Sequence, residues 1–419
     1  MQIDDCIPKP AAKILTLEEA REVVESTIAP LTGYEQLVLR NCLGRVLFDD
    51  VRAPIDIPQE AQSSMDGYAF NSRELAPGST SRFRVAGTSW AGRPYMASVS
   101  KGECVRIFTG AAMPSGTDSV VMQENVHRSD DLVEIPAGIR SQENIRTPGD
   151  EIERGQGVLE KGKRLSPADI GILASLGIHE IRVRRMPRVA FFSTGDELVS
   201  LDTPLEAGRI YDSNRYLLYG LLKALGIEAL DFGIVPDNRD EVLDALVETS
   251  AVSDVVITSG GVSVGDADLV RNAVASTGHI AFWKIAMKPG KPLAFGQFGA
   301  AQFFGLPGNP VSVFVTFYQI VRPALLRMMG AKPGKALRMQ AVCLKKIVKT
   351  PGRQEFQRGN LFIDESGTIR VVPSEKQQSH QLSAMARCNC FIVLPAECGG
   401  IEAGKPVEVE WIDPAFHFN

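Results

Sequence analysis

Residues 188–330 alternate short apolar segments with helix signals, and this alternation constrains the fold more than any other feature of the chain. Residues 189–192 and 254–258 have the composition of buried strands, while Asp212 and Asn309-Pro310 come just before helical patterns. Strands that alternate with helices predict a parallel sheet covered on both faces. The carboxyl ends of such strands share one edge of the sheet, where ligands bind.

The segments on either side of this region have a different pattern. Residues 53–149 hold short apolar stretches broken by Gly and Pro, which is typical of a small β-rich domain. Capping signals at Thr16 and at Ser166-Pro167 predict two helices outside it. Residues 337–415 are again short strands and turns, so we expect a C-terminal β domain.

Charge, hydropathy and cysteine usage exclude several classes of protein. The 419 residues carry a net charge of −5, which argues against a general nucleic-acid binder. The longest apolar run, residues 311–321, is far shorter than the roughly 20 residues that span a bilayer. Residues 1–15 do not resemble a secretory signal, and seven scattered cysteines indicate reduced thiols. We therefore expect a soluble cytoplasmic enzyme.

Four predicted strand ends carry glycines and polar residues, at residues 193–197, 235–238, 259–268 and 305–310. Glycine turns before helices let backbone N–H groups approach an anion. One such turn is more often only a tight turn, but two on one edge, with acids beside them, favour a phosphate site. The candidate substrate-binding residues in these turns are Thr194, Ser259, Gly260, Gly261, Ser263, Gly308 and Asn309.

Three lysines lie in one segment near the same predicted edge. Lys284 falls among apolar residues, where an unpaired ammonium group would be costly, so it should meet a carboxylate or a phosphate. Lys288 and Lys291 lie in a loop stiffened by two prolines. The alternative is that these are solvated loop lysines. We interpret all three as candidates for binding an anionic substrate.

Acidic residues accompany the glycine turns. Glu197, Asp237 and Asp268 lie at three of the strand ends, and Asp66 lies in the β-rich segment. Carboxylates together with substrate phosphates form Mg²⁺ sites, because Mg²⁺ prefers hard oxygen ligands. Each acid has an alternative role as a helix N-cap, and this alternative is strongest for Asp237, which directly precedes a helix. We predict that Glu197, Asp237 and Asp268 hold Mg²⁺.

Seven motifs, taken together and in order, resemble the molybdopterin molybdenumtransferases, which are the MoeA-like enzymes related to the gephyrin E domain. They are Ser63-Ser64-Met65-Asp66-Gly67-Tyr68-Ala69, IFTGAAMP at 107–114, FSTGDEL at 192–198, YDSN at 211–214, SGGVSVGDAD at 259–268, KPGKP at 288–292 and GLPGNPVS at 305–312.

The resemblance implies a multidomain α/β plus β fold with four parts. These are an elongated linker domain, an inserted β-rich domain, a three-layer α/β molybdopterin-binding domain with a parallel-rich sheet, and a C-terminal β-barrel-like domain. The expected bounds are 14–52 with 150–186, 53–149, 187–330 and 337–415.

The resemblance also implies an activity, namely insertion of molybdenum from molybdate into adenylylated molybdopterin, with release of AMP and use of Mg²⁺. Family members form homodimers whose active cleft is shared between subunits, and a molybdopterin adenylyltransferase and molybdoenzyme apoproteins are further expected partners. Two alternatives stay open: an adenylyltransferase of the preceding step, and a non-catalytic molybdopterin-binding or scaffold protein. The sequence does not distinguish molybdate from tungstate as the oxyanion.

Residue by residue, the resemblance assigns two sets of positions. The expected catalytic residues are Asp66, Glu197, Asp237, Asp268, Lys284 and Lys288. Added to the turn residues and Lys291, the expected substrate-binding residues are Thr109, Pro307, Pro310, Arg358 and Ser379. Two departures weaken parts of this transfer. Asp150-Glu151 reverses the order usual in the family, so neither receives a role, and the sequence after Ser379 differs from the commoner form.

Overall fold

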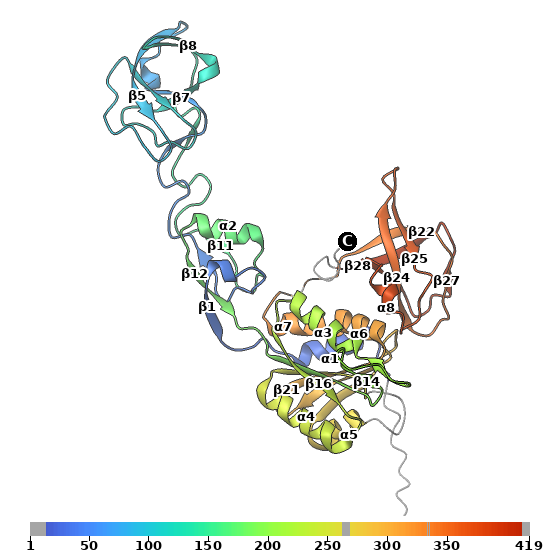
Figure 1. Ribbon diagram of the computed structural model, residues 1–419. Helices are drawn as coiled ribbons and strands as arrows, with labels where there is room; N and C mark the ends of the chain where they lie inside the picture. The colour runs from blue at the N-terminus through green and yellow to red at the C-terminus, as the bar shows by residue number, and fades with distance from the viewer. Residues whose placement is uncertain (1–13, 262–268, 333, 335, 413–419) are drawn as a thin grey trace, which may run out of the picture.

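The computed structural model describes residues 14–261, 269–332, 334 and 336–412. The molecule is elongated, with a small β-rich body at one end and an α/β body next to a β-barrel at the other (Figure 1). A narrow linker separates the two ends. The expected multidomain α/β plus β fold is therefore confirmed.

A six-stranded sheet forms the centre of the α/β body. Its order is β16 (Ala229–Val235), β13 (Val189–Thr194), β17 (Val255–Ser259), β21 (Ala301–Leu306), β20 (Pro292–Phe298) and β18 (His279–Lys284). Five of these strands point the same way, and only β20 runs antiparallel to its neighbours. The apolar pattern of residues 281–287 predicts one strand, whereas β18 ends at Lys284, and β20 was not predicted.

Helices cover both faces of this sheet, which confirms the three-layer arrangement. One face packs against α1 (Leu17–Thr27), α3 (Ser213–Ala224), α6 (Pro310–Thr316) and α7 (Arg322–Met328). The other packs against α4 (Arg239–Val252) and α5 (Leu269–Thr277). Phe304 faces the first layer and Phe303 the second, as expected for neighbouring residues of a strand.

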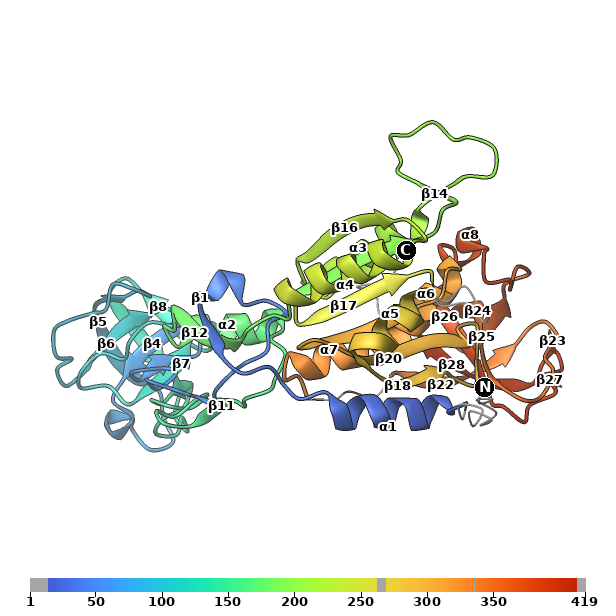
Figure 2. The same cartoon turned by 90° about the horizontal axis from the view of Figure 1, so that it is seen from below.

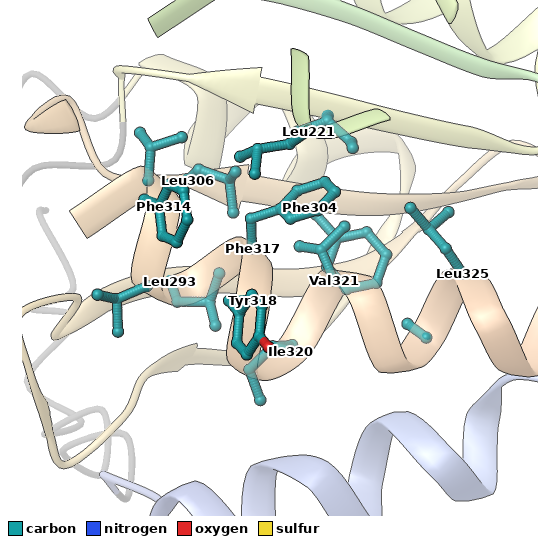
Figure 3. Packing of buried hydrophobic residues seen from close by; sticks show 14 of the residues in the cluster. Leu221, Leu293, Phe304, Leu306, Phe314, Phe317, Tyr318, Ile320, Val321 and Leu325 are labelled. Atoms are coloured by element: carbon teal, nitrogen blue, oxygen red, sulfur yellow. The ribbon is translucent and has the colours of Figure 1, made fainter. Parts of the chain in front are cut away.

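The core under α6 and α7 is the largest of the molecule. The two helices are joined without a break by a π-helical turn, η4 (Phe317–Val321), in which every residue is buried. Phe304 of β21 lies against Phe317 and Val321 of this continuous helix (Figure 3). The helix begins at the sheet edge where β21 ends, so its packing fixes the position of that edge.

The linker pairs segments from before and after the inserted body. Its elements are β1 (Tyr34–Val38) with β12 (Glu180–Arg184), β2 (Val51–Arg52) with β11 (Gly157–Leu159), η1 (Leu39–Asn41) and α2 (Pro167–Ser175). The predicted capping boxes are present at the starts of α1 and α2, from Thr16 and Ser166 respectively.

The small body is built on a six-stranded sheet of order β7-β4-β6-β5-β9-β8. Its elements are β3 (Gln62–Ser63), β4 (Gly67–Phe70), η2 (Ser72–Glu74), β5 (Ser81–Ser89), β6 (Glu103–Ile107), β7 (Ser119–Met122), η3 (Gln123–Asn125), β8 (His127–Ser129), β9 (Leu132–Ile135) and β10 (Ile145–Arg146). Its own buried aromatic core, which includes Phe70 and Phe83, makes it a separate packing unit.

The C-terminal region closes into a five-stranded barrel, because β24 pairs with both β25 and β26. Its elements are β22 (Arg338–Cys343), β23 (Ile347–Val348), β24 (Gln354–Ile363), β25 (Ile369–Pro373), α8 (Leu382–Met385), β26 (Cys390–Leu394), β27 (Gly400–Ile401) and β28 (Pro406–Trp411). A short strand of the α/β body, β19 (Met287–Lys288), pairs in parallel with β24 and joins the two bodies. Among the described helices, none has the length and apolar character needed to cross a membrane.

Candidate functional site

A cleft of ≈ 1160 Å³ lies at the carboxyl edge of the central sheet, and the barrel contributes part of its wall. The sequence-predicted residues that line it are Thr194, Glu197, Asp237, Ser259, Gly260, Gly261, Lys288, Lys291, Pro307, Gly308, Asn309, Pro310 and Ser379. These residues come from six segments that are far apart in the chain. The predicted convergence of the strand ends on one edge is therefore observed for the described residues.

Hydrogen bonds hold the ends of strands β17 and β21 together and tie both to helix α3. The Asn214 side chain donates from Nδ2 to the Ser259 hydroxyl at 2.8 Å and to the carbonyl of Gly308 at 2.7 Å. The backbone N–H of Gly260 donates to the carbonyl of Leu306 at 3.2 Å. Asn214 begins the first turn of α3, so that helix fixes the spacing of the glycine turns.

Three buried polar atoms on cleft-lining residues have no hydrogen-bond partner within the part of the chain that the structure describes. They are the Thr194 hydroxyl, one carboxylate oxygen of Asp212 and the side-chain oxygen of Asn214. An unsatisfied buried polar atom costs about 1–3 kcal/mol. The cost is recovered if a polar ligand in the cleft forms the missing bonds, so all three atoms suit the binding of a hydrophilic substrate.

Gly260 requires its small size as well as its conformation. Its φ is +93°, and a Cβ at this position would collide with the carbonyl oxygen of Thr194. We expect Gly260→Ala to cost at least about 1–2 kcal/mol in stability and to weaken ligand binding in the cleft. The matched control is Gly220→Ala in α3, where a Cβ meets no atom within 4 Å. That change should stabilise the protein by about 0.5–1 kcal/mol. Thermal unfolding of both variants checks the opposite signs, and equal shifts would contradict the prediction.

The Asp237 carboxylate is not the helix cap that its position in the sequence allowed. Asn238 takes that role, accepting from the backbone N–H groups of Asp240 at 2.9 Å and Glu241 at 3.4 Å. Asp237 instead lines the cleft with Glu197. Its partial burial, followed by the negative charges of Asp196 and Glu197, raises the pKa of Asp237. A cation placed among these carboxylates would relieve their repulsion.

Only part of the predicted metal set lies in the described chain. Glu197 and Asp237 line the cleft, while Asp268 and the substrate-binding candidate Ser263 lie outside the described residues. Within the described ranges, no three Asp, Glu, His or Cys side chains are grouped closely enough to hold a metal. The oxygen donors of Glu197 and Asp237 are nevertheless the type that Mg²⁺ prefers.

The three lysines differ in their surroundings. Lys288 lines the cleft and forms an ion pair with Glu355 of the barrel at 3.1 Å. Lys291 also lines the cleft. Lys284 ends β18 at the same sheet edge, opposite Pro292, but it is not among the residues of the cleft wall. The alternation that placed Lys284 among apolar residues holds only partly, because its side chain is half-buried.

The barrel contributes a loop to the cleft. The carbonyl of Ser379 accepts a hydrogen bond from the N–H of Val311, in the first turn of α6, at 3.0 Å. Arg358 is fully buried beneath this loop and donates to the carbonyls of Lys376 at 2.6 Å and Gln378 at 3.3 Å. Burial lowers the pKa of Arg358. Arg358 therefore supports the loop from below and is not part of the cleft wall.

Asp66 and Thr109 form a pair in the small β-rich body, away from the cleft of their own chain (Figures 1 and 2). One oxygen of Asp66 accepts from both the N–H and the hydroxyl of Thr109, each at 2.8 Å. These two bonds lower the pKa of Asp66. These hydrogen bonds join the two motifs that contain Asp66 and Thr109. Within one chain, neither motif reaches the other candidate site residues.

Several cleft residues were missed by the sequence analysis. Glu355 lies on the barrel strand β24, and its side chain is only 8% exposed. Asn214 belongs to the YDSN motif, which signalled it without indicating its bonds. Gln378 and His380 flank Ser379 in the barrel loop. The motif could have identified Asn214, but the other three come from the barrel and meet the cleft only through tertiary packing.

Comparison with known proteins assigns the family. Three family models match the chain: the MoeA N-terminal region (domain I and II) at residues 15–177, a probable molybdopterin binding domain at 190–327, and the MoeA C-terminal region (domain IV) at 340–412. A molybdopterin molybdenumtransferase of Haemophilus influenzae is 42% identical over 402 residues, which cover 95% of this chain and 98% of that protein. This chain belongs to the MoeA family of molybdopterin molybdenumtransferases.

Other relatives agree with this assignment to the MoeA family. A molybdopterin molybdenumtransferase of a Nostoc species is 36% identical over 374 residues, covering 87% of this chain and 86% of that protein. The crystal structure of a molybdopterin biosynthesis MoeA protein from Pyrococcus horikoshii OT3 superposes with a TM-score of 0.82 at 28% identity, covering 96% of this chain and all of that one. The expected enzyme class, a transferase of molybdenum cofactor biosynthesis, is confirmed.

Proposed function

We propose that this enzyme inserts molybdenum from molybdate into adenylylated molybdopterin and releases AMP. The observation that carries the proposal is the single cleft in which glycine turns, two lysines and two carboxylates from separate loops come together. Turn amides and ammonium groups suit phosphate and molybdate, both of which are anions. The carboxylates suit a cation that accompanies the phosphate.

Glu197 and Asp237 are the described residues that would hold Mg²⁺, and Asp268 is the third predicted ligand. When bound, Mg²⁺ supplies charge neutralisation at the phosphate, which is worth several kcal/mol in such sites. Partial burial and then the charges of Asp196 and Glu197 raise the pKa of Asp237, which supports this assignment, because a bound cation would offset both effects.

The chain's own groups then bind and orient the two substrates. An oxygen nucleophile, from molybdate or from water, attacks the adenylate phosphorus. The phosphoanhydride bond to the molybdopterin phosphate breaks, and AMP leaves. Lys288, Lys291 and the turn amide of Gly261 offset the negative charge that develops on the phosphoryl oxygens. The two dithiolene thiols of the substrate lose their protons and bond to molybdenum, displacing one oxygen of molybdate. That oxygen leaves as water, or on AMP where molybdate is the nucleophile, and molybdenum keeps its oxidation state.

Molybdate-dependent release of AMP from adenylylated molybdopterin tests the proposal. Purified protein, Mg²⁺ and the adenylylated substrate should release AMP only when molybdate or tungstate is added. Molybdate labelled with ¹⁸O shows whether its oxygen enters AMP or whether water is the nucleophile. AMP release that does not depend on the oxyanion would contradict the proposal. Formation of adenylylated molybdopterin from ATP would instead support the adenylyltransferase alternative.

We further propose that the active form is a homodimer in which the inserted body, residues 53–149, serves the cleft of the partner subunit. Within one chain, Asp66 and Thr109 lie far from that cleft (Figure 1). Among the expected catalytic and substrate-binding residues, they are the two that belong to neither the α/β body nor the barrel. A two-fold dimer gives each cleft the small body of the other chain.

Mixing two inactive variants tests the shared cleft. Asp66→Ala and Asp237→Ala should each be inactive as homodimers. A heterodimer keeps one complete cleft, with Asp237 from one chain and Asp66 from the other. Co-refolded equal mixtures should therefore recover about a quarter of wild-type activity, because half of the dimers are mixed and each has one working cleft. Absence of recovery in mixtures shown to contain heterodimers would contradict the shared cleft.

A further inference from the structure

The ion pair between Lys288 and Glu355 crosses the boundary between the α/β body and the barrel. Lys288 ends the short strand β19, and Glu355 is its register partner on β24. The ammonium and carboxylate groups are 3.1 Å apart. The lysine side chain is 53% exposed and the glutamate side chain only 8% exposed. Both residues line the cleft.

Glu355 is itself held in place from the barrel side. Its carboxylate accepts a hydrogen bond from the Gln357 side chain at 3.0 Å, and Gln357 also donates to the carbonyl of Val348 at 3.3 Å. Glu355 and Gln357 are both buried. A carboxylate fixed in this way gives a long, flexible lysine side chain one preferred position, because charge-assisted hydrogen bonds are strong and directional.

We propose that Glu355 is a positioning residue for the reaction, which holds the Lys288 ammonium group at the junction of barrel and α/β body, where the oxyanion substrate binds. This inference rests on the proposed function. Glu355 fixes the position of the Lys288 ammonium group for the transition state, but its negative charge also repels the incoming anion and lowers substrate affinity in the ground state. A residue with only a structural role would not have these two opposed effects.

Substitutions of the two partners should change KM for molybdate in opposite directions. Glu355→Gln keeps an oxygen that accepts from Gln357, but it removes the negative charge beside Lys288. KM for molybdate should then fall about three- to tenfold while kcat also falls, the pattern expected when ground-state repulsion and transition-state positioning are lost together. Lys288→Met removes the ammonium group, so KM for molybdate should rise and kcat should fall.

Two further variants separate positioning from folding. Glu355→Asp keeps the charge and should restore most of kcat. Glu355→Gln in a Lys288→Met background should cause no further loss, because residues that act through one another are not additive. The matched control is Glu375→Gln, which breaks the exposed Lys345–Glu375 pair of the barrel outside the cleft and should leave both constants unchanged.

Calorimetric titration with molybdate alone provides a readout that does not need turnover. Molybdate should bind Glu355→Gln more tightly, and Lys288→Met more weakly, than it binds the wild-type protein. If molybdate bound the wild-type protein, Glu355→Gln and Lys288→Met with equal affinity, the role of Glu355 would be overturned. The same holds if Glu355→Gln lowered kcat as much in the Lys288→Met background as in the wild-type protein. If the wild-type protein binds molybdate but never releases AMP, the proposed function fails and the titration still decides the inference. If the wild-type protein binds no molybdate, both fail.

Discussion

Asp237→Asn is expected to lower the rate of molybdate-dependent AMP release by about two to three orders of magnitude. The estimate follows from the loss of one preorganised charged contact at a phosphoryl group, which typically costs this much. Asp237 lines the cleft and is not used to cap α4, because Asn238 does so. Steady-state kinetics at saturating Mg²⁺ and molybdate would measure the effect. A variant that retains more than about a tenth of the wild-type rate would contradict it.

The same variant should be at least as stable as the wild-type protein at neutral pH. The folded protein raises the pKa of Asp237, so the charged form is disfavoured relative to the unfolded chain. The stabilising contribution of the protonated form is present at low pH and is lost as the pH rises through the raised pKa. Removing the charge should therefore raise the unfolding temperature slightly at pH 7, and the gain should vanish below about pH 4.

A matched carboxylate distinguishes a site effect from a general loss of charge. Asp244 is an exposed residue of α4 that is not part of the cleft wall. Asp244→Asn should leave both the rate and the unfolding temperature close to wild type, since such surface substitutions usually change stability by less than about 0.5 kcal/mol. Added Mg²⁺ should raise the unfolding temperature of the wild-type protein and of Asp244→Asn more than that of Asp237→Asn.

Phe304→Ala should have the largest effect on stability, about 3–5 kcal/mol. Phe304 is fully buried in β21, and its ring centre is 5.0 Å from that of Phe295. It also packs under the helix that begins at the cleft (Figure 3). The unfolding temperature of the α/β body should fall on the order of 10 °C. Differential scanning calorimetry, which can resolve separate transitions, is the appropriate measurement.

The control for this prediction is Phe362→Ala in the barrel. Phe362 is 43% exposed, so its truncation leaves little cavity and should cost less than about 1 kcal/mol. If the two variants unfolded at the same temperature, the core under α6 and α7 would not stabilise the α/β body in the way that its packing indicates.

Local sequence signals predicted most of the α/β body. The cap at Asp212 and the apolar strands of residues 189–192 and 254–258 gave the correct elements, because each depends on neighbouring residues. The strand β20 was missed because its apolar run follows the KPGKP turn without a helix before it. Its antiparallel pairing is decided by β18 and β21, which are tertiary neighbours.

The sequence predicted the candidate site only at positions that follow directly from the parallel sheet, namely the ends of its strands. Glycine turns and acids at strand ends were expected on one edge, and Gly260, Asp237 and Pro307 are found there. Glu355 was not expected, because only the β19–β24 pairing brings it to Lys288. Arg358 was expected to contact substrate, whereas the closed barrel buries it under its own loop. Contacts between separate bodies of one chain leave no local pattern in the sequence.

The most direct test of the central claim is the position of the oxyanion itself. Crystals of the protein soaked with tungstate and AMP would reveal tungsten by its anomalous scattering. The strongest peak should lie in the cleft at the carboxyl edge of the central sheet, within reach of Lys288 and the glycine turn at Gly260. If the strongest peak lay elsewhere at full occupancy, while this cleft contained no tungsten, the account would be contradicted.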